Sequence, residues 1–303
     1  IQEASNCEVV AIASRTAERA EEAAAQLGIA RAYGSYQALL DAPDVDAVYI
    51  PLPNDLHAEW TLRAAAAGKH ILCEKPLALD AEQAQEMVDG CAEAGVKLQE
   101  AFMYRHHPTW VEAIRLIRSG AIGTVQAVHS FFSYFNDDPN DIRNRVENGG
   151  GAIMDIGCYN INLSRLVFDA EPSVLEAVVR RDPDMGIDTL TSAVLGFPRG
   201  GQSSPTCSPR AEDFQRVHIA GTGGRVEIDS PHNIPPGADT RISVTAGGEP
   251  PLAPATETIV FPPANQYTIQ AELFAQSILD DTPVPVDPSD AVANMKVIES
   301  ILG

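Results

Sequence analysis

One lysine in this chain stands where a ligand would bind. Lys75 belongs to the tripeptide Glu74-Lys75-Pro76, directly after a short apolar segment, residues 70–73, that we expect to be a strand. Ligands of open parallel sheets bind at the carboxyl ends of the strands, and Pro76 would stop strand pairing and hold Lys75 extended. A surface ion pair at a strand end is the simpler alternative. Lys75 is nevertheless conspicuous, because the sequence contains few lysines: Lys69, Lys75, Lys97 and Lys296.

A second group of candidates follows a run of glycines at residues 149–151. Asp155, Tyr159 and Asn162 come at positions i, i+4 and i+7 of a helix that we predict over residues 152–168. This spacing places the three polar side chains on one helix face, and glycine lets the preceding backbone approach a ligand or another backbone closely. A solvated helix face is the alternative, and Asp155 also suits a helix start through the helix dipole. Tyr159 argues against it, because Glu or Lys would serve a solvated face better.

The end of another expected strand, residues 7–14, bears on the choice of cofactor. The strand ends in Ser14 and Arg15, and Arg19 follows one helical turn later. Sheets that bind NAD place an acidic residue here, whereas those that bind NADP place an arginine. A hydroxyl and two guanidinium groups suit a 2′-phosphate, because arginine gives bidentate, charge-assisted hydrogen bonds to it. A helix-capping serine beside solvated arginines explains the same residues, so the sequence alone leaves both interpretations open.

The elements that would position these residues change in character near residue 120. Before it, apolar strands alternate with helices, which is typical of a parallel sheet with right-handed crossovers. After it come a strand over residues 124–135, a polar loop, the helix that carries Tyr159, and then strands in succession, which predict a mostly antiparallel sheet. We therefore expect an α/β protein with a Rossmann-type doubly wound domain at residues 1–120 and an α+β domain with an open sheet at residues 121–303. The expected later strands are 174–181, 189–197, 215–221, 225–228, 241–245 and 256–261, before helices near 269–279 and 288–302.

The glycine-rich turn of a dinucleotide-binding domain does not occur in this sequence. Such a domain opens with a strand, a G-x-G-x-x-G turn and a helix that together cradle the pyrophosphate. Residues 1–6 look like the tail of that first helix, so we expect the first strand, loop and helix, on the order of 20–25 residues, to be missing from the sequence. A flavodoxin-like domain that never had such a loop is the alternative.

Composition narrows the classes of partner. The formal net charge of −21 argues against nucleic acid and anionic membranes, because phosphate contacts need clustered Lys and Arg. No apolar run approaches the roughly 18 residues of a membrane span, and no export signal opens the chain. The 5 scattered cysteines are typical of reduced thiols in a cytoplasmic protein. His106-His107 and residues 136–141 lack the ligand spacing of zinc and calcium sites, so we expect no metal.

These motifs together resemble one known family over essentially the whole chain. The sequence resembles the glucose–fructose oxidoreductase, inositol dehydrogenase and rhizopine-catabolism (Gfo/Idh/MocA) family. Within it, the sequence is most similar to the branch of glucose–fructose oxidoreductase, NADP-dependent xylose dehydrogenases and dimeric dihydrodiol dehydrogenase. Tyr159 stands where many other members have a histidine, which favours this branch. Each matching motif is modest alone, and their order and spacing make the set specific: Pro51-Leu52-Pro53-Asn54 with His57, Glu74-Lys75-Pro76, Glu100-Ala101-Phe102-Met103-Tyr104-Arg105, and Met154-Asp155-Ile156-Gly157-Cys158-Tyr159.

The resemblance implies a role for each candidate residue. Lys75 would bind the reacting oxygen and the nicotinamide ribose, and Tyr159 would be the acid/base. A free tyrosine, with a pKa of about 10, is a poor base at neutral pH, and a close ammonium group favours its phenolate. Asp155 would orient the substrate or the lysine, and Asn162 would contact the substrate. The expected cofactor contacts are Ser14, Arg15 and Arg19 at the 2′-phosphate, together with Pro51, Asn54, His57, Glu74, Lys75 and Arg105.

The sequence thus predicts an NAD(P)-dependent dehydrogenase or reductase that acts on CH–OH groups. It would transfer a hydride between NADP(H), preferred over NAD(H), and a sugar, an anhydro-sugar or a trans-diol. The alternative is a non-catalytic NAD(P)- or sugar-sensing regulatory protein of the same fold, against which the presence of Lys75 and Tyr159 argues. The open face of the antiparallel sheet further predicts a homodimer or higher homo-oligomer.

Overall fold

A computed structural model describes residues 1–247 and 255–303, which form two compact units. The first unit comprises Ile1–Ala78, Glu82–Ala101 and Tyr267–Val292. The second comprises Leu79–Ala81, Phe102–Gln266 and Ala293–Gly303. The expected fold class is confirmed, because the first unit has parallel sheets and the second has one large, mostly antiparallel sheet.

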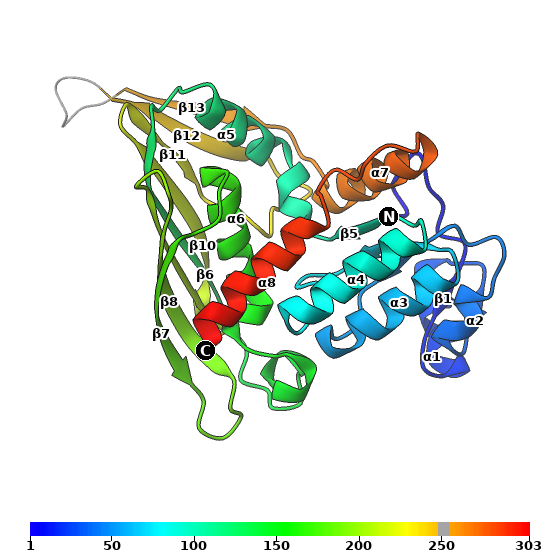
Figure 1. The fold of residues 1–303 in the computed structure, drawn as a ribbon. Helices are drawn as coiled ribbons and strands as arrows, with labels where there is room; N and C mark the ends of the chain where they lie inside the picture. The colour runs from blue at the N-terminus through cyan, green and yellow to red at the C-terminus, as the bar shows by residue number, and fades with distance from the viewer. Residues whose placement is uncertain (248–254) are drawn as a thin grey trace. The chain divides into compact units, whose positions relative to one another are not determined.

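The first unit contains two small parallel sheets (Figure 1). In one, β1 (Ile12–Ala13) pairs with β2 (Ala32–Tyr33). In the other, β4 (His70–Cys73) lies between β3 (Ala47–Ile50) and β5 (Leu98–Glu100). Parallel pairing puts the carboxyl ends of β3 and β4 at the same edge of the sheet. The helices along this part of the chain are α1 (Ala17–Leu27), α2 (Tyr36–Leu40), α3 (His57–Ala66), α4 (Ala81–Glu93) and α7 (Gln266–Leu279).

The strand expected over residues 7–14 is much shorter in the structure. Only Ile12–Ala13 pairs with a neighbour, and residues 7–11 have no strand assignment. The apolar run predicts burial, but a strand also needs a partner backbone for its N–H and C=O groups. The short elements β2 and α2, which sequence patterns did not predict, provide that partner and its connection.

The core of the first unit joins segments that are far apart in the sequence. Leu72 of β4 and Ala101 after β5 are buried against Phe274 of α7. Because Phe274 is nearly fully shielded from water, the residues from Tyr267 onward fold with strands that precede them by about two hundred positions. The hydrophobic contact, and not sequence order, determines where α7 belongs.

The second unit is built on one eight-stranded sheet (Figure 1). Its order is β13-β12-β11-β10-β6-β9-β8-β7, and every neighbouring pair is antiparallel except β6 with β9. The strands are β6 (Val125–Phe135), β7 (Val174–Arg181), β8 (Asp188–Gly196), β9 (Gln202–Ser208), β10 (Arg210–Gly221), β11 (Gly224–Ile228), β12 (Thr240–Ala246) and β13 (Thr256–Phe261).

Sequence patterns missed β9, although it lies near the middle of the sheet. Its residues are mostly small and polar, and Pro205 pairs with Ser130 of β6. A proline inside a run argues against a central strand, so local propensity was misleading. Tertiary contacts stabilise the strand instead: Ser203 Oγ lies 2.6 Å from Ser164 Oγ, and Ser208 Oγ donates to the Thr189 carbonyl at 2.8 Å.

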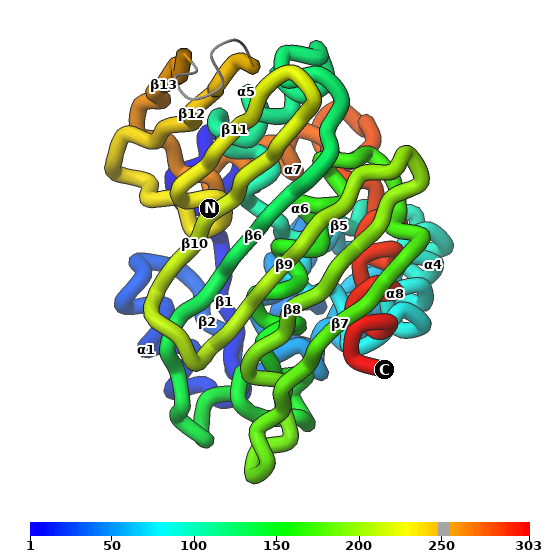
Figure 2. Tube along the Cα trace, turned by 90° about the vertical axis from the view of Figure 1, so that its left-hand side faces the viewer, coloured from blue at the N-terminus to red at the C-terminus, as the bar shows by residue number. Residues whose placement is uncertain are grey.

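One face of the sheet packs against the helix that carries the candidate residues. A π-helical turn (Ile153–Gly157) leads into α6 (Cys158–Phe168), whose Ile161 and Leu163 are fully buried. Figure 1 shows α6 along this face, and Figure 2 shows the opposite face, which no helix of the described part of the second unit covers. The unit also includes α5 (Pro108–Arg118) and the end of α8 (Ser289–Leu302). No helix in the described residues is long and apolar enough to cross a membrane.

The glycine run before the π-helical turn allows another backbone to pack closely. A Cβ on Gly150 would lie 2.5 Å from the Arg143 carbonyl oxygen, and one on Gly151 would lie 2.2 Å from Asp188 Oδ1. Gly151 also has φ +122, a conformation that side chains disfavour. Asp188, which is buried, accepts a hydrogen bond from the Ile153 N–H at 3.0 Å. The glycines therefore let loop and carboxylate lie directly against the start of this helix.

Candidate functional site

The turn that contains Lys75 is held by buried polar groups of the first unit. Lys75, half-buried, follows β4, and the Lys75–Pro76 peptide is cis. Glu100, at the end of β5, accepts a hydrogen bond from the Leu77 N–H at 2.8 Å. His57 Nδ1 lies 3.0 Å from the Pro76 carbonyl oxygen. These contacts fix the backbone that follows Lys75, at the carboxyl end of β4.

His57 joins two loops. Its Nε2 lies 2.8 Å from the Leu52 carbonyl oxygen, and the ring is fully buried. Burial lowers the pKa of His57, and a neutral imidazole can donate to only one of its two carbonyl neighbours. The ring therefore ties the loop after β3 to the Lys75 turn, and the expected contact between His57 and the cofactor stays a prediction.

Two tyrosines that sequence reasoning missed lie beside the Lys75 turn. Tyr49 of β3 donates a hydrogen bond to Glu74 Oε1 at 2.6 Å. Burial, and then the charge of Glu74, raise the pKa of Tyr49, so this phenol stays protonated. Burial also raises the pKa of Tyr267, at the start of α7, while the charge of Lys75 acts in the opposite direction. A sequence signal existed for Tyr49 alone, because it precedes the Pro51-Leu52-Pro53-Asn54 motif on a predicted strand.

The other expected cofactor residues of the first unit lie on loops and helix starts. Thr16, and not Ser14, caps α1, because its side chain accepts the Arg19 N–H. Arg15 and Arg19 are exposed, and neither guanidinium has an ion-pair partner among residues 1–247 and 255–303. After β3, Pro51 is exposed and Asn54 begins the short 3-10 turn that precedes α3.

In the second unit, Tyr159 is surrounded by aromatic rings. Its side chain is only 5% exposed, and its hydroxyl lies 3.6 Å from Met103 Sδ. Its ring centroid is 5.1 Å from Phe102 and 5.1 Å from His232. Phe132 of β6 and Tyr104 complete the cluster at 5.9 and 6.0 Å. The alternative of a solvated helix face is therefore wrong, and the environment of this phenol is apolar and closely packed.

Asn162 supports a neighbouring phenol within the same cluster. Its Oδ1 accepts a hydrogen bond from Tyr104 Oη at 2.6 Å, and the side chain is fully buried. Asn162 thus holds the Tyr104 phenol in place, and its expected contact with the substrate stays a prediction. Arg105, expected on the cofactor side, lies in the 3-10 turn after Phe102 and belongs to the second unit.

Asp155 faces two residues that were not expected. Its Oδ2 accepts a hydrogen bond from Tyr134 Oη at 2.5 Å, and its Oδ1 lies 3.4 Å from Arg143 Nε. Tyr134 and Phe132 are two positions apart on β6 and share one face. Asp155 therefore contacts Tyr134, and Tyr159 contacts Phe132, on the same face of β6. The alternation of side chains along the predicted strand could have identified Tyr134. Arg143 lies in an irregular loop, where the sequence has no such pattern.

His232 completes the wall around Tyr159. Its Nε2 lies 3.1 Å from Asn160 Oδ1, and the amide nitrogen of Asn160 donates to the Thr206 carbonyl. Its ring stacks on Phe132 with centroids 5.0 Å apart. Complete burial lowers the pKa of His232 to about 3, so the ring is neutral at physiological pH. The loop that carries it is rich in Gly and Pro and has no periodic pattern, so sequence gave no sign of this contact.

Family models match both units. Residues 1–102 match the model described as the oxidoreductase family with an NAD-binding Rossmann fold, and residues 110–227 match the GFO/IDH/MocA C-terminal domain. The chain belongs to the Gfo/Idh/MocA oxidoreductase family. Its members named below are dehydrogenases, reductases or oxidoreductases, and this protein is accordingly an oxidoreductase enzyme, as the sequence predicted.

Two relatives cover nearly all of this Gfo/Idh/MocA chain. It is 45% identical over 298 residues to an uncharacterized oxidoreductase of Rhizobium meliloti, covering 98% of this chain and 89% of that protein. It is 39% identical over 300 residues to a D-xylose 1-dehydrogenase (NADP(+)) of Haloferax volcanii, covering 99% of this chain and 90% of that protein.

Two solved structures share the fold closely. The aldose-aldose oxidoreductase from Caulobacter crescentus, complexed with glycerol, has a TM-score of 0.90 at 32% identity, over 99% of this chain and 90% of that one. A 3-ketoreductase from Actinomadura kijaniata, complexed with NADP and TDP-benzene, has a TM-score of 0.87 at 32% identity, over 97% and 89%. That reductase has also been solved with one tyrosine changed to Phe and one lysine changed to Ala or Glu. Those two positions are separated by as many residues as Lys75 and Tyr159.

The neutral state of His232 predicts that acid destabilises the protein. The unfolded chain protonates this histidine near pH 6.5, whereas the folded protein does so only near 3, so stability is lost as pH falls through this range. Between pH 7 and pH 5 the loss is about 2 kcal/mol. His232→Phe keeps a ring against Phe132 and cannot ionise, so its urea midpoint should change less over the same range. Equal pH dependence in both proteins would contradict the assignment.

Proposed function

We propose that this enzyme transfers a hydride between NADP(H) and a sugar, an anhydro-sugar or a trans-diol, with Tyr159 as acid/base and Lys75 as its assisting cation. The observation that carries the proposal is the environment of Tyr159: a phenol in an aromatic cluster, beside a histidine that is neutral. Such a phenol is shielded from competing protons and solvent. The first unit would bind the dinucleotide, and the second would bind the substrate.

The proposed chemistry divides between the cofactor and two side chains. When bound, the nicotinamide supplies the hydride acceptor or donor. In oxidation, Tyr159 accepts the proton of the substrate hydroxyl at its phenolic oxygen while the C–H electron pair leaves as hydride. In reduction, Tyr159 returns that proton to the new alkoxide. The Lys75 ammonium group stabilises negative charge on the substrate oxygen and favours the phenolate of Tyr159.

Two further observations support these roles. In the Actinomadura kijaniata reductase, the substituted lysine and tyrosine have the same spacing as Lys75 and Tyr159, which supports these two residues as the corresponding pair. Glu100 and His57 hold the backbone directly after Lys75, and a group that must meet a reacting atom requires such fixed positioning.

The residues after β1 fit a 2′-phosphate and support NADP over NAD. Because Thr16 supplies the helix cap, Ser14 is not needed for it, and the alternative explanation of this serine is wrong. Arg15 and Arg19 are exposed, so their guanidinium groups can pair with a phosphate without first breaking an ion pair. The Haloferax volcanii relative is named for NADP(+), and the Actinomadura kijaniata structure contains NADP.

Replacing either proposed catalytic residue should stop turnover without unfolding the protein. We expect Lys75→Ala and Tyr159→Phe each to lower kcat/KM by about a thousandfold or more, because each removes a group that acts on the reacting proton or its charge. Absorbance of reduced nicotinamide, with a panel of aldoses and polyols, measures this. Lys296→Ala, on the exposed surface of α8, is the matched control. Near-normal rates in both variants would refute the mechanism.

Removing the proposed phosphate contact should change cofactor preference. Arg15→Ala should raise the KM for NADP by about 10- to 100-fold, the usual effect of losing a hydrogen bond between charged groups, and leave the KM for NAD nearly unchanged. Steady-state kinetics with both cofactors test this, with the exposed Arg199→Ala as control. A similar change for both cofactors would rule out recognition of the 2′-phosphate by Arg15.

We propose that the uncovered face of the eight-stranded sheet (Figure 2) joins two copies of the chain. That face exposes three large apolar side chains: Val178 (76% exposed), Val194 (44%) and Phe214 (47%). Exposed apolar side chains gathered on one face mark an interaction surface. Light scattering should give the mass of a dimer or larger oligomer, and Val194→Asp with Phe214→Asp should reduce it to a monomer. A monomer in the unmodified protein would contradict this proposal.

A further inference from the structure

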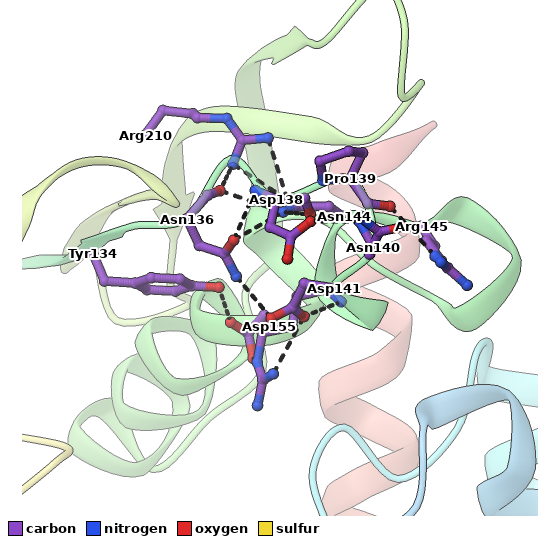
Figure 3. A network of polar contacts seen from close by, with 11 residues as sticks. Tyr134, Asn136, Asp138, Pro139, Asn140, Asp141, Asn144, Arg145, Asp155 and Arg210 are labelled. Atoms are coloured by element: carbon purple, nitrogen blue, oxygen red, sulfur yellow. Dashed lines mark hydrogen bonds and ion pairs between the residues drawn. The ribbon is translucent and has the colours of Figure 1, made fainter.

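A polar cluster beside Asp155 brings together three side chains from separate segments. Figure 3 shows two of them, Tyr134 and Asp155, pointing toward each other. Tyr134 comes from β6, Asp155 from the π-helical turn, and Arg143 from the loop between β6 and that turn. The Asp155 carboxylate accepts a hydrogen bond from Tyr134 at one oxygen and lies 3.4 Å from Arg143 Nε at the other. The cluster thus contains a phenol, a carboxylate and a guanidinium group.

The loop that carries Arg143 is held by contacts that do not involve its guanidinium group. Asn144, which is buried, donates to the Asp138 carbonyl at 2.8 Å, and Asn136 donates to Asp141 Oδ2 at 2.9 Å. Arg210 of β10 reaches the same loop, where it donates to the Asn136 carbonyl and to Asn144 Oδ1 (Figure 3). The loop therefore keeps its conformation without the pairing of Arg143 and Asp155.

The backbone of Arg143 is fixed more firmly than its guanidinium group. Its N–H donates to Asp141 Oδ1 at 2.8 Å, and its carbonyl accepts the Gly151 N–H at 2.9 Å. In contrast, its side chain is 50% exposed and makes two long contacts of 3.4 Å, to Asp141 and Asp155. Arginine has five N–H donors, and the others of Arg143 have no partner within residues 1–247 and 255–303. The fixed backbone of Arg143 thus holds guanidinium N–H donors next to Asp155.

The charges of the cluster favour an uncharged ligand. Burial, and then the Asp155 carboxylate, raise the pKa of Tyr134, so this phenol remains a donor and cannot act as a base at neutral pH. One guanidinium faces two carboxylates, Asp141 and Asp155, so the cluster carries no excess positive charge for a phosphate or carboxylate. Neutral hydroxyl groups, which both donate and accept, match a carboxylate beside a guanidinium.

We propose that Arg143 is a specificity-determining residue that donates a hydrogen bond to a hydroxyl of an uncharged sugar, and that Tyr134 is a positioning residue that orients Asp155 for the same sugar. This inference rests on the proposed sugar oxidoreductase function and narrows its substrate class. An uncharged polyol should bind better than its phosphorylated or nucleotide-linked counterpart. Neither residue takes part in the proton transfer at Tyr159.

Sugar binding to the NADP-loaded protein tests this without turnover. Calorimetric titration with D-xylose and each of its monodeoxy analogues should show one hydroxyl whose removal weakens binding by about tenfold, as expected for one hydrogen bond to a charged group. In Arg143→Gln, D-xylose and that analogue should bind equally. Tyr134→Phe should weaken the binding of D-xylose by a smaller factor. Arg145→Gln, in the same loop with its side chain on the Pro139 carbonyl, is the matched control and should bind as the unmodified protein does.

The outcomes separate this inference from the proposed function. If Arg143→Gln keeps the full difference between D-xylose and every analogue, the role of Arg143 is wrong while sugar oxidation stands. If xylose 5-phosphate binds more tightly than D-xylose through Arg143, the uncharged class is wrong. Absence of binding by D-xylose and by the wider aldose panel would overturn the inference, and absence of turnover with intact binding would overturn only the proposed function.

Discussion

The start of the helix that carries Asp155 and Tyr159 depends on a buried carboxylate. Asp188 of β8 accepts hydrogen bonds from the Ile153 N–H and from Thr191, at 3.0 and 2.7 Å. The first N–H groups of a helix have no partner within it, so Asp188 both caps the helix and attaches it to the sheet. The attachment works only because Gly151 has no side chain, since a Cβ there would clash with the same carboxylate. The direction in which Tyr159 leaves the helix follows from this contact.

Tyr134 and Tyr159 have different chemical environments. Tyr134 donates to the Asp155 carboxylate, and burial, followed by that charge, raises the pKa of Tyr134 and keeps it protonated. Tyr159 instead lies among Phe102, Phe132 and the neutral ring of His232. Since a neighbouring charge shifts the equilibrium between phenol and phenolate, the carboxylate beside Tyr134 separates its environment from the aromatic surroundings of Tyr159, the acid/base that we propose. The same strand, β6, provides a partner for each.

Sequence patterns predicted the alternating and consecutive elements well where hydrophobic periodicity was strong. The strand before Lys75 and the strands over residues 174–181 and 256–261 are examples. They failed where a tertiary contact outweighs local propensity. Residues 202–208 form a central strand despite Pro205, because Ser203 and Ser208 hydrogen-bond to α6 and β8. In contrast, residues 7–11 are mostly apolar and form no strand, because no strand of the described residues pairs with them.

The sequence by itself determined the family, the fold class and the candidate site residues, because the spacing of motifs along a chain can be read without knowing which residues are in contact. Lys75, Asp155 and Tyr159 are identified in this way. Only the tertiary structure decided what surrounds them. It showed that His57 and Asn162 are fully buried. It also brought Tyr134, Arg143 and His232 to the candidate residues from a strand and two irregular loops. Burial and neighbouring charge, which set what a polar group can do, arise from contacts between distant segments, and no local pattern encodes them.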